Sequence, residues 1–171
     1  TGRDAFVSIN VSPLQLHDPS FVSAVATAVT EHRLPAAAVV LELTESIFLE
    51  DSQEVATALS RLRDVGVLLA VDDFGTGYCS LGYLGRFRFD VVKIDKSFVD
   101  ALGSAQGDRR LILGMLDLVE SLELPAVAEG VEHQVQADAL AAAGCRLAQG
   151  YLWSRPVAIQ ELVDHQDRVT D

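Results

Sequence analysis

Six short, mainly apolar runs alternate with stretches of helical periodicity, and this alternation limits the fold of the chain more than any other feature. Strands that read as unbroken apolar runs are typical of parallel sheets covered by helices. Their alternation with helices predicts an α/β fold with a parallel sheet, either open or closed into a barrel. The apolar runs are 5–9, 39–43, 67–71, 91–94, 125–128 and 145–148, and the main helical patterns are 21–32, 51–66, 108–122, 134–143 and 158–165.

A polar residue stands at or near the end of every apolar run. An open, doubly wound sheet would concentrate its functional groups at one switch point. A (β/α)8 barrel instead collects them from many strands at its C-terminal face, and we therefore favour a TIM-type barrel. The polar residues at these strand ends are Asn10, Glu42, Asp72 with Asp73, Lys93 with Asp95, Glu129, and Gln149.

The number of strands is smaller than such a barrel needs. A complete (β/α)8 barrel has eight strands and about 250 residues, whereas this chain has 171 residues and six strand-like runs. We expect residues 1–171 to be the C-terminal two-thirds of a single barrel domain, with two N-terminal strands missing. Because open sheet edges invite pairing with another chain, we also expect self-association or partial disorder.

Charge and cysteine content limit the class of protein. The net charge of −12 and the pI near 4.6 argue against non-specific DNA binding, which needs a basic surface. They do not exclude a nucleotide ligand, because bound cations can reverse the local sign. No run of about 18 apolar residues exists, so we expect no membrane span. Cys79 and Cys145 lack zinc-like spacing, and we interpret them as thiols of a cytoplasmic protein.

The adjacent pair Asp72-Asp73, followed by the glycine-containing stretch 74–77, is the sharpest local signal. Neighbouring carboxylates repel unless cations compensate them, and hard oxygen ligands without sulfur suit Mg²⁺ or Mn²⁺. Asn10, Glu42 and Asp72 could share one cation, while Asp73 and Glu129 could hold a second or position a water. Two such ions can clamp a phosphodiester for in-line attack. The alternative is an ordinary tight turn.

Four further polar residues have both a functional and a structural interpretation. Lys93 could stabilise the attacking water or a phosphate oxygen, or form a structural ion pair with Asp72 or Glu129. Gln149 suits a nucleobase edge, because it both donates and accepts, or it could simply cap a strand. Glu45 and Glu132 each lie three residues past a strand-end glutamate. They could anchor the glycine loop or cap the next helix.

Read together, the motifs resemble the EAL domain, the cyclic di-GMP phosphodiesterase family. The resemblance covers nearly the whole chain and rests on motifs that occur in the family's order. They are Asn10-Val11-Ser12, Glu42-Leu43-Thr44-Glu45-Ser46, Asp72-Asp73-Phe74-Gly75-Thr76-Gly77-Tyr78, Lys93-Ile94-Asp95, Ala128-Glu129-Gly130-Val131-Glu132, Gln149-Gly150-Tyr151-Leu152 and Ser154-Arg155-Pro156.

The resemblance implies a modified TIM barrel with one antiparallel strand, which opens cyclic di-GMP to linear pGpG with Mg²⁺ or Mn²⁺. It also implies a role for each matching residue, and a dimer interface at the glycine loop. The residues that match metal ligands are Asn10, Glu42 and Asp72, while Asp73 matches the ligand of the second ion. Glu129 matches the general base or a second-metal ligand, and Lys93 matches the lysine that helps hold the nucleophilic water. Gln149 matches a substrate-site glutamine, and Glu45 matches the residue that anchors the glycine loop. We add Glu132 to the expected substrate-binding residues.

One departure from the family pattern bears on activity. The Glu-Ala-Leu motif that names the family supplies a metal ligand from an early strand, and no such motif precedes Asn10. We therefore expect a phosphodiesterase whose activity is incomplete in this chain, with sensor or GGDEF domains upstream in the parent protein. The alternatives are a receptor that binds cyclic di-GMP without cleaving it and a dimerisation module.

Overall fold

A parallel sheet of six strands forms the centre of this computed structural model, which describes residues 6–45, 47, 52–77, 84, 87–103, 109–158 and 160–161. The strands lie side by side in sequence order, and every neighbouring pair is parallel. The predicted α/β class is therefore confirmed, with six strands in the described part of the chain. They are β1 (Val7–Val11), β2 (Val39–Thr44), β3 (Leu68–Phe74), β4 (Val91–Ile94), β5 (Ala126–Ala128) and β6 (Leu147–Ala148).

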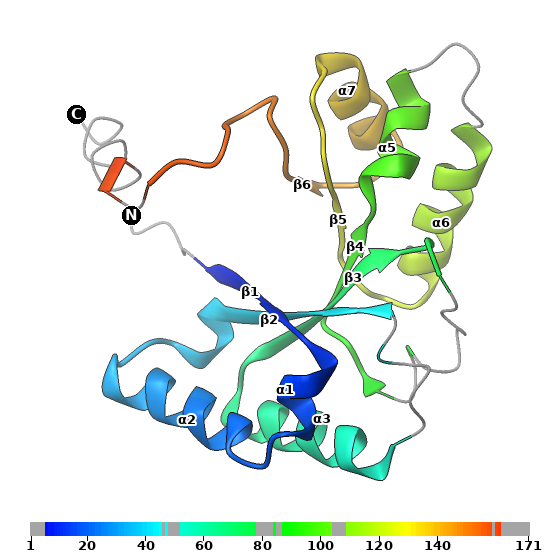
Figure 1. Ribbon diagram of the computed structural model, residues 1–171. Helices are drawn as coiled ribbons and strands as arrows, with labels where there is room; N and C mark the ends of the chain where they lie inside the picture. Colours follow the sequence, from blue (N-terminus) through cyan, green and yellow to red (C-terminus); the bar gives the residue numbers. More distant parts are fainter. Residues whose placement is uncertain are drawn as a thin grey trace.

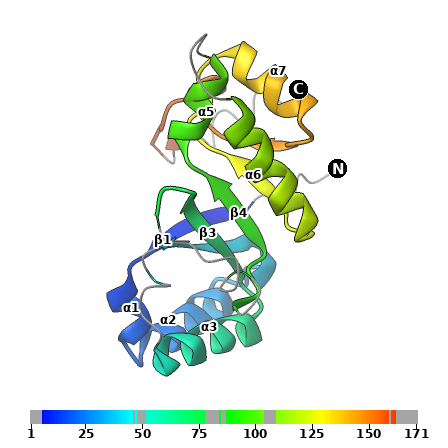
Figure 2. The ribbon, with the colours of Figure 1, turned by 90° about the vertical axis from the view of Figure 1, so that its right-hand side faces the viewer.

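Helices connect the strands and lie in two groups along the twisted sheet (Figures 1 and 2). The first group packs near β1 to β3, and the second near β4 to β6. The first contains α1 (Pro13–His17), α2 (Phe21–Glu31), the short 3₁₀ helix η1 (Ala36–Ala38) and α3 (Gln53–Val65); the second contains α5 (Lys96–Gly103), α6 (Arg109–Ser121) and α7 (Gln134–Ala142).

The hydrophobic core lies between the helices and the outward face of the sheet. Successive strand residues point to opposite faces, so alternate residues form this core. Leu41 on β2, Leu69 on β3 and Ile94 on β4 are at most 2% exposed, and they belong to one cluster with helical residues such as Leu62 and Val119. Each such side chain contributes about 1.5–3 kcal/mol through its burial, which explains why these positions of the strands are apolar.

Local sequence signals set the ends of α3. The Ser52 hydroxyl accepts hydrogen bonds from the backbone N–H groups of Glu54 and Val55, at 3.2 and 3.4 Å. Gly66 ends the helix with φ of 93°, a left-handed conformation that glycine adopts without strain.

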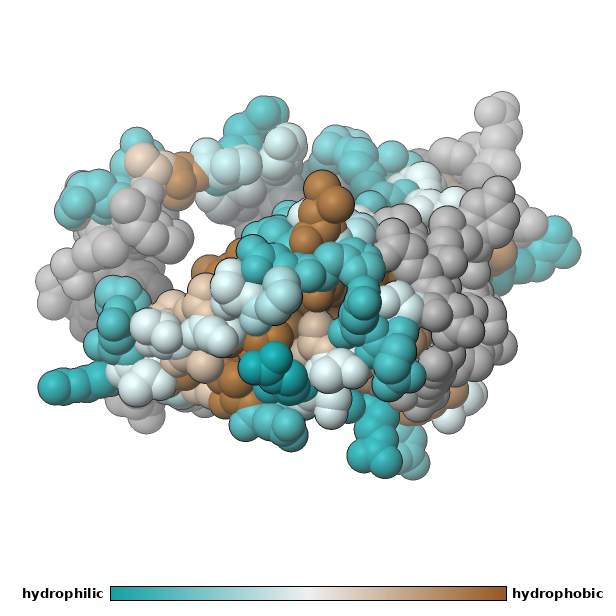
Figure 3. Space-filling view, turned by 60° about the horizontal axis from the view of Figure 1, so that its bottom comes forward, coloured by the Kyte–Doolittle hydropathy of each residue, from teal (hydrophilic) through white to brown (hydrophobic). Residues whose placement is uncertain are grey.

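The outer side of the first helix group is seen in Figure 3, where hydrophilic residues cover much of the surface and apolar residues show between them.

The opposite face of the sheet carries the polar residues. Val40 and Ala70 are buried on this face but lie outside the helix-packed cluster. Glu42 follows Val40 by two residues and Asp72 follows Ala70 by two, so both carboxylates share this inner face. The fold therefore separates an apolar outer layer from an inner face that ends in charged groups.

β1 and β6 are the two edge strands of the described sheet. Val7 and Ile9 of β1 are 50% and 47% exposed, although their neighbours Val39 and Leu41 on β2 are buried. The antiparallel strand implied by the resemblance is not among the six described strands. No helix in the described ranges is both long enough and apolar enough to cross a membrane.

Two details of the helices differ from the sequence pattern. The helical spacing of 108–122 predicts Leu111 on the same side as Met115 and Val119, which are buried, but Leu111 is 56% exposed. Helix α5 was not among the predicted helices, because its eight residues are too few for a clear periodicity. Cys79 and most of the predicted helix 158–165 lie outside the described residues.

Candidate metal centre

The parallel register places polar side chains from neighbouring strands side by side. Asn10 on β1 is the register partner of Glu42 on β2, and Thr44 on β2 is the partner of Asp72 on β3. Parallel strands direct their carboxyl ends to one edge, where loops leave the sheet. Asn10 therefore lies beside Glu42, although its own side chain is exposed.

A bulge in β3 brings the two adjacent aspartates to the same site. Val71 pairs with Val92, whereas Phe74 pairs with Ile94, so β3 advances three residues while β4 advances two. The extra residue breaks the alternation that would point Asp72 and Asp73 to opposite faces. Asp73 has φ of 55°, a conformation that costs a non-glycine residue about 1–3 kcal/mol. Such backbone strain concentrates at functional sites.

Lys93 on β4 is the centre of a buried charge network. Its Nζ lies 2.7 Å from Glu42 Oε2, 2.8 Å from Asp72 Oδ1 and 2.5 Å from Glu129 Oε1. The Lys93, Glu42 and Asp72 side chains are nearly excluded from solvent. Burial lowers the pKa of Lys93, but the hydrogen bonds to the three carboxylates outweigh it and raise the pKa, so the ammonium stays charged.

Negative charge exceeds positive charge in this cluster. Glu42, Asp72, Asp73 and Glu129 supply four carboxylates against the single ammonium of Lys93. Burial raises the pKa of Asp73, and the charges of Asp72 and Asp95 raise it further. Burial likewise raises the pKa of Glu129 despite its contact with Lys93. Uncompensated carboxylates of this kind are the arrangement that a divalent cation stabilises.

The donor atoms fit a hard divalent cation. One carboxylate oxygen from each of Asp72, Asp73 and Glu129 lies within 4.8 Å of the other two. All three donors are oxygen, and neither cysteine nor histidine belongs to this group. Oxygen donors of this type suit Mg²⁺ or Mn²⁺ rather than a thiolate-preferring metal. The geometry therefore supports a metal centre at the carboxyl ends of β3 and β5.

A hollow of about 680 Å³ opens beside this cluster, at the ends of β5 and β6. Gln149 donates a hydrogen bond of 2.6 Å from Nε2 to Glu129 Oε1 and joins the hollow to the charge network. The guanidinium carbon of Arg155 lies 4.8 Å from the centre of the Tyr151 ring. Lys96, Tyr151 and Arg155 all line the hollow, which therefore offers cationic and aromatic groups to a ligand.

Glu45 contacts the glycine loop that follows β3. Its Oε1 accepts a hydrogen bond of 2.7 Å from the backbone N–H of Gly75. Its other oxygen is buried and has no hydrogen-bond partner among the described residues. A side chain at Gly77 would place its Cβ 2.7 Å from this oxygen, so the loop approaches Glu45 closely only because glycine stands there.

The Glu132 carboxylate contacts Lys96, whereas its spacing suggested that it would anchor the glycine loop or cap the next helix. Its carboxylate forms an ion pair with Lys96 at the start of α5. The pair lies at the hollow beside Glu129, and the hydrogen bond from Lys96 lowers the pKa of Glu132. Lys96, Tyr151 and Arg155 were missed as single residues by the sequence argument. Tyr151 and Arg155 could have been found from the sequence, because they belong to the motifs 149–152 and 154–156.

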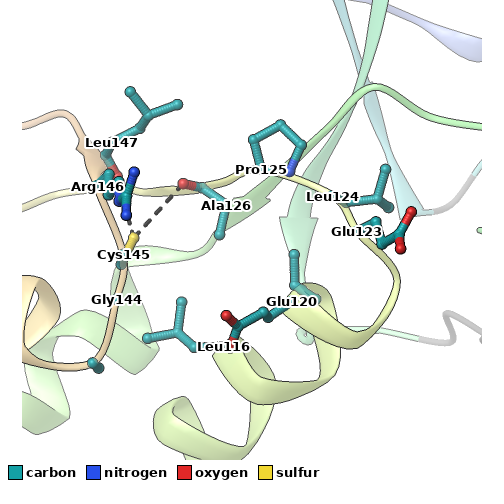
Figure 4. Close-up of a pocket in the computed structure, with 12 residues that line it drawn as sticks. Leu116, Glu120, Glu123, Leu124, Pro125, Ala126, Gly144, Cys145, Arg146 and Leu147 are labelled. Carbon is teal, nitrogen blue, oxygen red and sulfur yellow. Dashed lines mark hydrogen bonds between the residues drawn. The ribbon is translucent and has the colours of Figure 1, made fainter.

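A second hollow, of about 480 Å³, lies at the opposite ends of β5 and β6 (Figure 4). Cys145 lines it, with Sγ 3.7 Å from the carbonyl oxygen of Ala126 and 3.3 Å from that of Leu147. Burial raises the pKa of this thiol, so the thiolate is disfavoured. None of the strand-end residues predicted for chemistry lines this hollow.

Comparison with known proteins identifies relatives over most of the chain. The family model of the EAL domain matches residues 2–156. An uncharacterized protein of Mycobacterium tuberculosis is 44% identical over 91% of this chain and 25% of that protein. The cyclic di-GMP phosphodiesterase NbdA of Pseudomonas aeruginosa is 38% identical over 91% of this chain and 20% of its own length. The chain thus spans a quarter or less of these relatives.

Solved structures share the fold. The EAL domain of Mycobacterium smegmatis DcpA superposes with a TM-score of 0.88 and 42% identity, over 95% of this chain and 73% of that one. BlrP1 of Klebsiella pneumoniae, in a complex with manganese and cyclic di-GMP, superposes with a TM-score of 0.80 and 32% identity, over 88% of this chain and 39% of that one. These neighbours confirm the predicted family resemblance and TIM-type fold.

Proposed function

The chain belongs to the EAL domain family, and we propose that it forms the metal-binding and substrate-binding part of a phosphodiesterase that hydrolyses cyclic di-GMP to linear pGpG. The observation that carries this proposal is the cluster of Asp72, Asp73 and Glu129 oxygens within 4.8 Å of one another, with an excess of negative charge around Lys93. NbdA, which is named as a cyclic di-GMP phosphodiesterase, and BlrP1, which binds manganese and cyclic di-GMP, support it.

Two divalent cations, Mg²⁺ or Mn²⁺, would be held by the oxygen donors at the strand ends. Asn10, Glu42 and Asp72 would hold one cation, and Asp73 with Glu129 would hold the other. When bound, such cations polarise a phosphate and lower the pKa of a water. The manganese in the BlrP1 complex supports a metal of this kind.

Lys93 would act as a fixed hydrogen-bond donor in this site. Its pKa is raised, so its Nζ keeps a proton throughout the neutral range. A buried ammonium at a developing negative charge stabilises the transition state more than it would in water. Lys93 would therefore orient the attacking water or contact a phosphate oxygen, and it would offset the carboxylates around it.

Glu129 would receive a proton from the attacking water at Oε1. Burial raises the pKa of this carboxyl, which brings its basicity nearer to the value that proton transfer at neutral pH requires. The water oxygen forms a new bond to phosphorus, one ring phosphorus–oxygen bond breaks, and the released sugar oxygen takes up a proton from solvent, while Glu129 returns its proton to solvent. Gln149 would orient Glu129 and contact the substrate, and Glu132 would line the substrate hollow.

Glu45 would hold the glycine loop against the sheet through its bond to Gly75.

We also infer that the parent protein is cytoplasmic, self-associates and carries sensor or GGDEF domains upstream. The length of the relatives supports further domains, because this chain covers at most a quarter of them. A receptor that binds cyclic di-GMP without cleavage would use the same hollow and is distinguished by the assay below.

Hydrolysis of cyclic di-GMP tests the proposal. The chain, and a chimera that adds the part of the DcpA EAL domain that this chain does not cover, are incubated with Mn²⁺ or Mg²⁺, and chromatography measures pGpG. We expect pGpG from the chimera, little or none from the chain alone, and none from the chimera with Glu129→Gln. Glu120→Gln, an exposed position on α6, is the matched control. Binding without product from the chimera would establish a receptor instead.

A further inference from the structure

Gln136 is the most deeply buried uncharged polar side chain among the described residues, with 2% of its surface exposed. It lies in the first turn of α7. Its Oε1 accepts hydrogen bonds from the backbone N–H groups of Glu132 and His133, both at 2.9 Å. Its Nε2 donates to the carbonyl of Val99 on α5, at 3.4 Å. The one amide therefore joins α7, the segment 129–133 and α5.

These contacts exceed what the helix itself requires. The bond to the His133 N–H is enough to cap α7 from the side chain of its third residue. The bonds to Glu132 and Val99 instead connect the segment 129–133 to a different helix. A buried amide is costly unless its partners are supplied, so the position of Gln136 fixes the positions of all three backbone groups.

The segment 129–133 is pressed closely against α5. Gly130 has φ of +66°, and a Cβ there would lie 2.4 Å from the Cγ of Lys96. Lys96 reaches past this glycine to form its ion pair with Glu132. The segment leaves no room for a side chain at Gly130 on the side of α5, and Gln136 ties it to α5 through Val99.

The other side of the segment holds the chain that carries Gln149. Val131 donates from its backbone N–H to the Gln149 carbonyl at 3.1 Å, and it accepts from Leu152 at 3.0 Å. A Cβ at Gly150 would lie 2.2 Å from the Val131 carbonyl oxygen. Any shift of the segment therefore moves Gln149 together with Glu129, and these two side chains are hydrogen-bonded to each other.

We propose that Gln136 is a positioning residue: through the segment 129–133 it fixes where the Glu129 carboxylate stands relative to Asp72, Asp73 and Lys93. Its side-chain hydrogen bonds within the described residues go to backbone groups and not to these side chains, so it acts through the backbone. The inference rests on the proposed function, because its consequence is the geometry of the cation site.

The test compares Gln136→Leu, which removes all three hydrogen bonds, with Gln136→Glu, which keeps the two acceptor bonds. Gln134→Leu is the matched control, because Gln134 is exposed in the same turn and its side chain donates a hydrogen bond to Asp138 within α7. Two quantities are measured in the metal-free and Mn²⁺-titrated chain. They are the hydrogen-exchange protection of the Glu132 and His133 amides by NMR, and the Mn²⁺ affinity by electron paramagnetic resonance.

We expect Gln136→Leu to lose protection at both amides and to bind Mn²⁺ about tenfold more weakly, as for other supporting groups behind a metal site. Gln136→Glu, which loses the bond to Val99, should keep the protection and bind Mn²⁺ more tightly than Gln136→Leu. Gln134→Leu should change neither quantity. A folded Gln136→Leu chain with wild-type Mn²⁺ affinity would overturn the proposal. Where that variant does not fold, a Gln136→Glu chain whose Mn²⁺ affinity does not follow the protection of the two amides overturns it.

Failure of the proposed function gives a different result. If the wild-type chain binds no Mn²⁺, the metal proposal fails and the positioning role is judged in the metal-free chain. In the metal-free chain, the NMR chemical shift of the Lys93 ammonium, which contacts Glu129, should change in Gln136→Leu and not in Gln134→Leu. An unchanged Lys93 signal in the Gln136→Leu chain would overturn the positioning role as well.

Discussion

Lys93 Nζ lies 2.8 Å from Asp72 Oδ1, although the two residues belong to different strands and stand 21 positions apart in the sequence. Glu42 and Glu129 complete the surroundings of the same ammonium. The buried lysine is therefore the main positive charge of the cluster in the metal-free chain, and its removal has consequences for both stability and metal binding.

Lys93→Met should lower the free energy of unfolding of the metal-free chain by about 3–5 kcal/mol, because it leaves buried carboxylates without a partner. Urea denaturation measures this change. Lys96→Met is the control, because Lys96 is partly exposed and its ion pair with Glu132 should change stability little. Addition of Mn²⁺ should recover part of the loss in Lys93→Met. Equal midpoints for Lys93→Met and wild type would show that the network is not a source of stability.

Gly130→Ala should lower the free energy of unfolding by about 1–3 kcal/mol, because a side chain at a positive φ is strained and its Cβ would collide with Lys96. Gly114→Ala is the matched control in α6, where a Cβ meets no atom within 4 Å. That change should instead stabilise the helix by about 0.5–1 kcal/mol. Thermal melting compares the two variants. A stabilising effect of Gly130→Ala would contradict the close contact with Lys96.

The ion pair between Lys96 and Glu132 predicts a dependence on pH. The hydrogen bond from Lys96 lowers the pKa of Glu132 below its usual value of 4.5. A carboxyl whose pKa is lowered on folding adds stability above its unfolded pKa, and this contribution disappears as the pH falls through the lowered value. Lys96→Met should therefore raise the pKa of Glu132 toward 4.5.

NMR titration of the carboxyl carbons measures this pKa in both chains. Asp18 provides an internal control, because its pKa is lowered by hydrogen bonds from Ser20, far from Lys96 in the sequence, and should not change. A pKa of Glu132 that stays equally low without Lys96 would show that the ion pair is not its cause.

Glu45→Ala should release the glycine loop, because the backbone N–H of Gly75 loses its acceptor. Hydrogen exchange at Gly75 should become faster, by about tenfold for a lost bond of about 1.4 kcal/mol. Glu54→Ala, at an exposed position in the first turn of α3, is the control. Unchanged protection at Gly75 would mean that the loop is held by other contacts.

The sequence was sufficient to predict which residues gather at the strand ends. Asn10, Glu42 and Lys93 each stand near the end of an apolar run, and parallel strands necessarily bring such ends to one edge. The apolar outer layer follows from the same pattern. The order of the strands could be read in this way because each strand is a short, mainly apolar run, and because helical patterns separate most neighbouring strands.

The bulge in β3 could not be predicted from the sequence. The alternation of a regular strand would send Asp72 and Asp73 to opposite faces. Only the register against β4 shows the extra residue that brings both to the site. Gln136 was missed for a related reason. A glutamine in the first turn of a helix resembles an exposed cap, and its burial depends on α5, a helix that the pattern did not reveal.

The most direct test of the account is a crystal structure of the chain with Mn²⁺, with anomalous scattering used to locate the metal. We predict an anomalous peak for each of the two cations, one beside Asp72 and one beside Asp73 and Glu129, at metal–oxygen distances of about 2.0–2.6 Å, with the Lys93 ammonium still in the site. An ordered site with no anomalous peak at saturating Mn²⁺ would contradict the central claim that this cluster is a metal centre.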